Sequence, residues 1–385
     1  MVEWGNMKKI SILVLHLNYG GLERQITTLA NNLCNRYEVE IVSLYDILNG
    51  KSFYNLDKKV NVRFLLNYGP NKKEIKEAFR NINPFALIKE LIKGLKILIK
   101  KELLIKKEIE NIDTDILISS RIEFSKYIKR KDILTISQEH SFINSKAYSK
   151  KVKKSFRSVD YLVVMTNKAK DIYTKWLENE NNKPEVVVIP NMIENLEKNK
   201  YSKLNNKQII SVGRIENIKD FPTLIDVFEK VSLKLPNIIL KIVGDGSKKK
   251  SVEKYIKFKK MENKVFLLGK LDQTQVENEL INSDIFILTS KYESFSLVLC
   301  EAMSKGLPCI SFDVDVGPRE IITDKVDGFI IENRNIDLMS DKIINILEDE
   351  NLRNTMSKNA KCNSTRFYCE NIVSLWEKLF FNLKK

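Results

Sequence analysis

The amino-acid sequence predicts an α/β protein with two doubly wound parallel sheets, one after the other along the chain. Short runs rich in Ile, Val and Leu recur along the 385 residues, separated by segments with helical spacing. These runs are apolar almost without interruption, which is typical of strands that helices cover on both faces. A polar stretch at 191–207, rich in Asn, Lys and Glu, divides the runs into two series and indicates a linker between two domains.

The two series give the predicted strands in order. The first series lies at 9–15, 39–44, 115–119, 133–137, 161–165 and 186–189. The second lies at 208–212, 238–243, 264–268, 284–289, 308–312 and 328–331. We therefore predict Rossmann-like domains at 1–190 and 208–365, joined by the linker 191–207, and a final helix at 366–385, where apolar side chains recur at helical spacing.

Composition places the chain among ordinary globular proteins. Apolar residues make up 43% and charged residues 30%, which argues against a disordered, collagen-like or membrane-bundle protein. Five cysteines without a CxxC pair predict reduced thiols in a cytoplasmic protein, not disulfides or a zinc site. The apolar run Ile10–Leu15 is short for a signal peptide and is better interpreted as a buried first strand.

The positive charge is concentrated in the first half of the chain. The formal net charge is +15, and residues 1–200 hold 36 basic and 24 acidic side chains, which is +12. This excess favours an anionic partner such as phosphate, nucleic acid or a membrane surface. Because no nucleic-acid-binding module or basic-aromatic platform is present, we expect phosphates or a membrane and no nucleic acid.

Unusual residues follow the predicted strands in both halves. They are Gly20-Gly21, His140, Gly213-Arg214, Gly244-Asp245-Gly246, Glu293 and Gly317-Pro318. Open parallel sheets bind ligands beyond the carboxyl ends of their strands. We therefore expect a site at these ends, in a cleft between the two domains.

Arg214 and Lys219 follow the strand at 208–212. Gly213 lets the backbone turn close to a ligand, and two cations five residues apart on a strand-to-helix loop can reach one diphosphate. The alternative is a solvated loop in a protein that is rich in lysine.

The stretch from Glu293 to Ala302 is the most informative. Ser294 or Ser296 can cap a helix from Ser296 to Lys305, and the start of a helix offers free N–H groups to a phosphate. A phosphate site flanked by Glu293 and Glu301, whose carboxylates suit sugar hydroxyls, describes a nucleotide sugar. Alternatively, Glu293 is a helix-dipole partner and Glu301 a surface residue.

These motifs together resemble the retaining glycosyltransferases of family 4, which have the GT-B fold. In chain order the motifs are Gly20-Gly21-Leu22-Glu23-Arg24, Val212-Gly213-Arg214 with Lys219, Gly244-Asp245-Gly246 and Glu293-x7-Glu301. The resemblance covers nearly the whole chain, and the Glu-x7-Glu block is its specific part. It implies a nucleotide-sugar donor, best fitted by a UDP-sugar, on the second domain and an acceptor on the first.

The resemblance also implies roles for individual residues. Arg214 and Lys219 would bind the leaving diphosphate, Glu293 the donor-sugar hydroxyls and Glu301 the ribose. Further donor-binding positions would be Gly20, Gly21, Gly213, Gly244, Ser294, Phe295, Ser296, Leu297 and Val298. We expect Glu23 and Arg24 to contact the acceptor.

His140 matches the family's first-domain histidine, which contacts the donor sugar near the reacting centre. The alternative is a structural histidine at a strand end. With His140, the expected catalytic residues are Arg214, Lys219 and Glu293. In family members a C-terminal helix crosses back onto the first domain, which we expect of 366–385; a plain capping helix is the alternative.

Two Asp-x-Asp pairs, Asp113-x-Asp115 and Asp313-x-Asp315, have the spacing of the metal-binding motif of another glycosyltransferase class. Such pairs are common by chance, and the family generally works without a catalytic metal. We therefore expect neither a metal site nor a cofactor. The string 312–322 instead resembles transferases that build lipid-linked oligosaccharides, lipopolysaccharide, capsule or teichoic acid.

The segment 85–107 has apolar residues at helical spacing with lysines between them, after Pro84. A basic amphipathic helix suits an anionic membrane surface, so we expect a cytoplasmic protein at the inner face of the membrane. The alternative is a helix that packs on its own sheet and exposes a lysine face.

We therefore predict a retaining glycosyltransferase that transfers a hexose or N-acetylhexosamine from a UDP-sugar to a lipid-linked or surface polysaccharide acceptor. An NAD-dependent oxidoreductase is one alternative, although no G-x-G-x-x-G follows either first strand. A non-hydrolysing UDP-sugar epimerase is another, which the Glu-x7-Glu block does not suggest.

Overall fold

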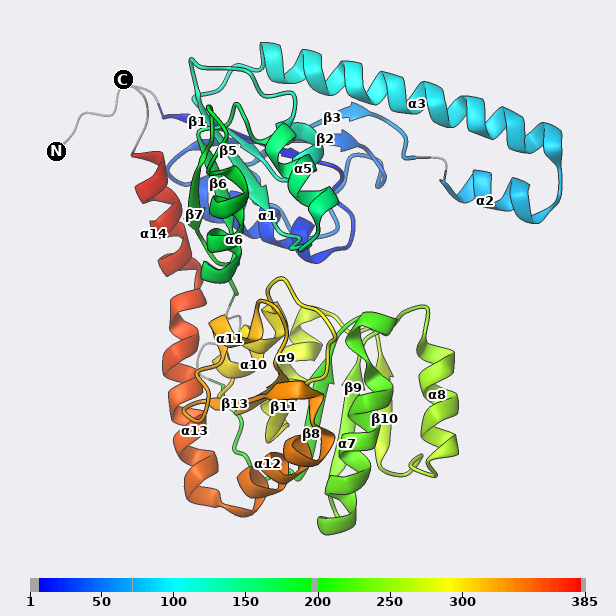
Figure 1. Ribbon diagram of the computed structural model, residues 1–385, viewed down its shortest axis with the longest axis vertical. Helices are drawn as coiled ribbons and strands as arrows, with labels where there is room; N and C mark the ends of the chain where they lie inside the picture. The colour runs from blue at the N-terminus through cyan, green and yellow to red at the C-terminus, as the bar shows by residue number, and fades with distance from the viewer. Residues whose placement is uncertain (1–6, 71, 195–199, 382–385) are drawn as a thin grey trace. The chain divides into compact units, whose positions relative to one another are not determined.

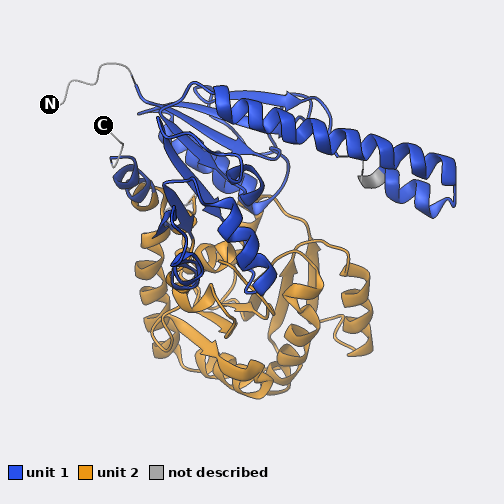
Figure 2. Cartoon of the chain, turned by 45° about the horizontal axis from the view of Figure 1, so that its top comes forward, with its two compact units in different colours: residues 1–164, 169–189, 373–385 blue, residues 165–168, 190–372 orange. Residues whose placement is uncertain are grey.

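A computed structural model of the chain describes residues 7–70, 72–194 and 200–381. Part of the predicted linker and the last four residues of the predicted C-terminal helix lie outside this range. The chain divides into two units (Figure 2). The first comprises residues up to Val164, Ala169–Ile189 and the chain from Val373 onward, and the second comprises Met165–Lys168 and Pro190–Ile372.

The first unit contains a seven-stranded sheet in the order β3-β2-β1-β4-β5-β6-β7, in which every pairing is parallel. Its strands are β1 Lys9–Val14, β2 Glu38–Tyr45, β3 Asn61–Leu66, β4 Ile116–Ser119, β5 Leu134–Glu139, β6 Tyr161–Val164 and β7 Glu185–Val188. The helices between them are α1 Gly21–Leu33, α2 Lys72–Arg80, α3 Pro84–Asn111, α4 Ile122–Ser125, α5 Lys146–Ser155 and α6 Asn167–Leu177 (Figure 1).

The second unit contains a six-stranded parallel sheet in the order β10-β9-β8-β11-β12-β13. Its strands are β8 Gln208–Val212, β9 Ile239–Val243, β10 Val265–Gly269, β11 Ile285–Leu288, β12 Cys309–Phe312 and β13 Gly328–Ile331. Its helices are α7 Phe221–Lys234, α8 Lys249–Phe258, α9 Gln273–Ile281, α10 Leu297–Ser304, α11 Pro318–Ile321, α12 Ile336–Glu348 and α13 Glu350–Ser364. Both sheets are thus the doubly wound parallel sheets that the sequence predicted.

Burial on both faces of the sheet explains why the strands could be predicted from the sequence. In the second unit, one face of the sheet packs against α7 and α12 through a cluster that includes Phe228 and Ile343. The other face packs against α10 and α13 through Met303 and Ala360. Strands enclosed in this way need apolar side chains at successive positions.

The edge strand β3 was not predicted from the sequence. It lies at an open edge of the first sheet, and its exposed and half-buried positions alternate with few apolar runs. Arg63 in this strand donates to Glu40 of β2 (Nε to Oε1, 3.0 Å) and to Glu108 of α3 (Nη2 to Oε1, 2.5 Å). A strand that exposes one edge and carries such ion pairs lacks the continuous apolar run of an interior strand.

The final helix α14, Cys369–Phe380, begins later than the expected helix, after a 3₁₀ turn at Thr365–Phe367. The residues from Val373 onward belong to the first unit. There, Arg36 donates to Glu377 (Nη1 to Oε2, 2.7 Å) and Tyr37 packs edge-on against Phe380. Within the described part of the chain, every helix is too short or too polar to cross a membrane.

Gly244 follows β9 at a position that only glycine fits. Its φ is +143°, and a Cβ atom there would lie 1.9 Å from the Gly213 carbonyl oxygen. We expect Gly244→Ala to lower the free energy of unfolding by about 2 kcal/mol or more, because backbone would have to move. Thermal unfolding followed by circular dichroism measures this.

Gly21→Ala is the matched control. Gly21 is the first residue of α1, and a Cβ atom there would meet nothing within 4 Å. Alanine also favours a helix over glycine, so this variant is expected to unfold at or slightly above the wild-type temperature. Equal stability of the two variants would contradict the packing argument.

Candidate functional site

The second unit places its predicted donor residues at the switch point of its sheet. β8 and β11 are neighbours, although α7, β9 and β10 separate them in sequence, and the strand order reverses between them. The loops that follow these two strands carry Arg214 and Lys219 on one side and Glu293 on the other. Such switch points are where open α/β sheets bind ligands.

Lys219 and Glu293 form an ion pair across this switch point. Lys219, at the end of a 3₁₀ turn at Asn217–Lys219, donates from Nζ to Glu293 Oε1 at 2.5 Å. Ser290 Oγ donates to the same oxygen at 2.7 Å. Both charged side chains are largely buried, and a buried carboxylate needs such partners to remain charged. Arg214, in contrast, is exposed.

Sequence reasoning missed the residues that hold the two loops together. Arg334 Nη2 donates to Asp220 Oδ2 at 2.6 Å, and Arg334 Nη1 donates to the Ser290 carbonyl at 2.9 Å. Thr289 Oγ1 donates to the Lys219 carbonyl at 3.1 Å. The position of Ser290 after β11 was a signal that could have been used, whereas nothing in the sequence marks Arg334.

The predicted phosphate-binding helix is present as α10. Ser296 is its N-cap residue and Lys305 its C-cap residue, close to the expected range. The Leu299 amide bonds to the Ser296 carbonyl at 3.2 Å, so Leu297 and Val298 stand in the first turn, where N–H groups have no helical acceptor. The Ser296 hydroxyl oxygen is buried and makes no hydrogen bond among the described residues.

Glu301 is 4% exposed in the interior of α10, so the alternative that it is a surface residue is wrong. Phe295, before the helix, packs edge-on against Phe367 with ring centroids 5.6 Å apart. The Ser294 hydroxyl lies 3.4 Å from the Tyr292 hydroxyl. The Glu-x7-Glu block therefore forms a rigid, mostly buried segment.

Gly317 packs directly on this segment. Its φ is +94°, and a Cβ atom there would lie 3.3 Å from Glu293 Cβ. Just before it, Asp313 accepts two bonds from Arg319, from Nε and Nη2, both at 2.7 Å. This bidentate pair gives Asp313 a structural partner within the second unit.

In the first unit, the switch point lies between β1 and β4. Gly20 precedes α1, and a Cβ atom there would lie 2.0 Å from Glu23 Oε2, so the Glu23 side chain folds back over this glycine. Glu23 is buried, with Arg121 Nη2 at 3.3 Å and His16 Nδ1 at 3.5 Å from its Oε1. Arg24 beside it is half-buried.

His140 follows β5 directly, because this strand continues two residues beyond its predicted end. The ring Nε2 of His140 lies 3.3 Å from Gln138 Oε1. The residue before it, Glu139, was missed by sequence reasoning. Tyr148 Oη donates to Glu139 Oε2 at 2.6 Å, and the Ser141 amide donates to Oε1 at 2.9 Å, which holds the loop that carries His140.

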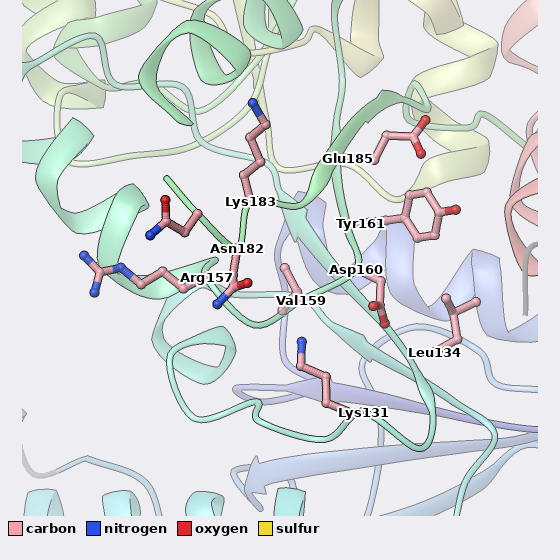
Figure 3. A pocket seen from close by; sticks show the side chains of 10 residues that line it. Lys131, Leu134, Arg157, Val159, Asp160, Tyr161, Asn182, Lys183 and Glu185 are labelled. Atoms are coloured by element: carbon pink, nitrogen blue, oxygen red, sulfur yellow. The ribbon is translucent and has the colours of Figure 1, made fainter. Parts of the chain in front are cut away.

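Figure 3 shows a hollow in the first unit. It measures about 400 Å³ and is lined by the first residues of β5, β6 and β7, Leu134, Tyr161 and Glu185. It therefore sits at the amino ends of the strands. None of the predicted site residues lines it.

Burial raises the pKa of the Glu139 carboxyl from 4.5 to about 7. Because folding disfavours the charged form, this group contributes full stability below about pH 4.5, and the contribution is lost as the pH rises through about 7. A pKa shift of this size corresponds to about 3 kcal/mol in the free energy of unfolding. Between pH 5 and pH 8, the free energy of unfolding should therefore fall less in Glu139→Gln than in the wild type.

Urea unfolding followed by tryptophan fluorescence measures this effect in the first unit, because residues 190–372 contain no tryptophan. The exposed Glu178→Gln serves as the control and should keep the wild-type pH dependence. An unchanged pH dependence in Glu139→Gln would show that Glu139 titrates normally.

Comparison with known proteins adds independent information. Residues 192–362 match the family model for glycosyl transferases group 1. An uncharacterized glycosyltransferase of Haemophilus influenzae is 28% identical over 376 residues, which cover 96% of this chain and 99% of that protein. Together these matches support a GT-B glycosyltransferase.

Two further comparisons agree. A Campylobacter jejuni α-1,4-N-acetyl-D-galactosaminyltransferase, named for a PP-undecaprenol-linked acceptor, is 26% identical over 98% of this chain and 99% of its own length. A solved structure of S. aureus TarM in complex with Fondaparinux, alpha-GlcNAc-glycerol and UDP has a TM-score of 0.74. That match covers 97% of this chain and 100% of TarM at 19% identity, and it confirms the fold alone. The comparisons do not favour the oxidoreductase or the epimerase.

Proposed function

We propose that this protein is a retaining glycosyltransferase of family 4. It transfers a hexose or N-acetylhexosamine from a UDP-sugar to a hydroxyl of a lipid-linked or surface polysaccharide acceptor in bacterial cell-envelope glycan synthesis. The observation that carries the proposal is the Lys219–Glu293 pair at the β8/β11 switch point, next to the start of α10. The group 1 family match, which spans most of the second unit, supports it.

In this proposal the second unit binds the donor. Arg214 and Lys219 neutralise the diphosphate, and the first-turn amides of α10 bind its oxygens. Glu293 accepts hydrogen bonds from the sugar hydroxyls, and the buried Glu301 accepts those of the ribose. Diphosphate binding would draw the Lys219 ammonium toward the phosphate and leave Glu293 for the sugar.

The reaction is a displacement on the face from which the nucleotide leaves. The bond between the sugar's anomeric carbon and the phosphate oxygen breaks, and a bond to the acceptor oxygen forms on the same face. The departing phosphate oxygen takes the acceptor's proton, so the protein supplies orientation and charge stabilisation rather than a nucleophile. In this proposal His140 contacts the donor sugar and no metal takes part; the ion pair of Asp313 with Arg319 supports a structural role for Asp313.

The first unit binds the acceptor in this proposal, through the segment that contains Glu23 and Arg24. Because the Glu23 carboxylate is engaged by Arg121, we assign Glu23 to positioning this segment and Arg24 to acceptor contact. A lipid-linked acceptor places the enzyme at the cytoplasmic face of the membrane. The Campylobacter jejuni relative, which is named for a PP-undecaprenol-linked acceptor, supports this class of substrate.

UDP binding tests the donor site. In calorimetry with EDTA present, UDP should bind, while GDP, ADP and NAD should bind more weakly or not at all. Glu301→Ala should weaken UDP binding by about tenfold or more, because hydrogen bonds to a buried carboxylate are lost.

Glu253→Ala, which removes an exposed carboxylate on α8, is the matched control, and circular dichroism establishes that both variants fold. UDP binding that requires added Mg²⁺ would contradict the metal-free site. Unchanged affinity in a folded Glu301→Ala would contradict the ribose assignment.

Turnover tests the two cations. Lys219→Ala and Arg214→Ala should each lower kcat by about 10²-fold, at least as strongly as they weaken UDP-sugar binding, because negative charge grows on the diphosphate in the transition state. Transfer from a panel of UDP-sugars to lipid-linked acceptors measures this. Lys257→Ala on the outer part of α8 should leave kcat unchanged. Near-normal turnover in both variants would contradict a catalytic role for Lys219 and Arg214.

A further inference from the structure

The helices α2 and α3 of the first unit form a hairpin with an apolar surface that the unit does not cover. In Figure 1 α3 runs past the sheet, with α2 alongside its outer part. The buried residues of α3 are Ile97, Ile105 and Ile109. Many of its other apolar residues are at least half exposed; they are Phe85, Ile88, Leu91, Ile92, Leu95, Leu98, Ile99 and Leu103.

Three rows of side chains run along α3. The apolar stripe comprises Phe85, Ile88, Ile92, Leu95 and Ile99, whose spacing of three and four residues keeps them on one face. The residue after each of the last four is an exposed lysine, and these form the lysine row, Lys89, Lys93, Lys96 and Lys100. The residues after the lysines form the inner row, Glu90, Gly94, Ile97 and Lys101, which is buried or half-buried.

The sequence had left two roles open for this helix, packing on its sheet or lying on a membrane. The C-terminal part of α3 satisfies the first role, because Ile105 and Ile109 are buried there and Glu108 accepts from Arg63 of β3. The apolar stripe remains exposed. The surface of a soluble protein normally exposes apolar residues singly rather than in a continuous stripe.

The most exposed apolar side chains of the hairpin gather where α2 turns into α3. Phe79 at the end of α2 is 73% exposed, Ile82 in the turn 89% and Phe85 at the start of α3 85%. Ile82 also has a φ of +51°, which is unfavourable for a β-branched residue. A large apolar residue in a strained turn, fully open to water, has no stabilising role inside this unit.

We propose that the α2–α3 hairpin docks on an anionic lipid bilayer. The apolar stripe and the tip residues Phe79, Ile82 and Phe85 enter the level of the acyl chains. The lysine row lies beside the stripe, where its long side chains extend to the lipid phosphates. The buried Ile105 and Ile109, with the ion pair from Glu108 to Arg63 of β3, keep the C-terminal part of the helix attached to its sheet.

Charge favours a bilayer over a second copy of this chain as the occupant. Residues 72–111 hold eleven basic and six acidic side chains, a net charge of +5. Two hairpins packed through their apolar stripes would bring two lysine rows together. An anionic lipid surface complements the same charges and is attracted by each lysine near it.

This inference rests on the proposed function in one respect, since a lipid-linked acceptor gives the enzyme a reason to reside at the bilayer. The donor site lies in the second unit and the hairpin in the first, so the two can be tested separately. UDP binding reports on the first proposal and vesicle binding on the second.

The test is co-sedimentation of the full-length protein with vesicles. Vesicles of phosphatidylcholine and phosphatidylglycerol in equal parts should bind at least about tenfold more protein than vesicles of phosphatidylcholine alone. The triple variant Ile88→Ser, Ile92→Ser, Leu95→Ser should lose about tenfold or more in binding, with unchanged affinity for UDP. Lys89→Glu with Lys93→Glu and Lys96→Glu should abolish the preference for anionic vesicles.

Matched controls come from exposed positions of the second unit. Leu233→Ser with Phe258→Ser removes apolar groups that are similarly exposed, and Lys254→Glu with Lys257→Glu reverses exposed charges on α8. Both controls should bind vesicles as the wild type does.

Equal vesicle binding by the wild type and the triple serine variant would overturn the proposal. So would a wild-type dimer in light scattering that the serine variant dissociates while neither protein binds vesicles, because a second copy would then cover the stripe. Vesicle binding that depends on the hairpin, in a protein that does not bind UDP, would support this inference and contradict the donor site.

Discussion

The buried ion pair between Lys219 and Glu293 is the constraint on which the candidate donor site depends. A carboxylate and an ammonium removed from water destabilise a fold unless they meet each other and further hydrogen-bond partners. Ser290 supplies a second donor to Glu293, and Arg334 ties the loop after β8 to the loop after β11. The same contacts that satisfy these charges therefore fix the positions at which a diphosphate and a sugar would be held.

Buried carboxylates with polar partners also lie near the strand ends of the first unit. Glu23 is buried against Arg121, and Glu139 is buried against Tyr148 and the Ser141 amide. In each case a carboxylate inside the protein fixes a segment that carries a predicted site residue, which is Arg24 at the start of α1 or His140 in the loop after β5. These carboxylates fix the two segments because a buried carboxylate requires partners, whereas Arg24 and His140 beside them are only half-buried.

The α3 helix meets two demands at once. Its C-terminal part packs on the first sheet with Ile105 and Ile109 buried, and its apolar stripe and lysine row are not used by that packing. A helix presents different residues every 100°, so a single sequence can serve a sheet on one side and a lipid surface on another. The amphipathic pattern alone did not separate these roles, because both produce apolar residues at helical spacing.

The sequence by itself determined the interior strands and the start of α10, because full burial demands continuous apolar runs and because Ser296 marks the start of that helix locally. It did not determine the edge strand β3, whose open edge allows polar residues such as Arg63. Only the tertiary structure decided the pairing of Lys219 with Glu293, 74 residues away, and of Asp220 with Arg334, 114 residues away. Partners so distant in sequence meet because their strands are neighbours in the sheet, and no local sequence pattern predicts which strands become neighbours.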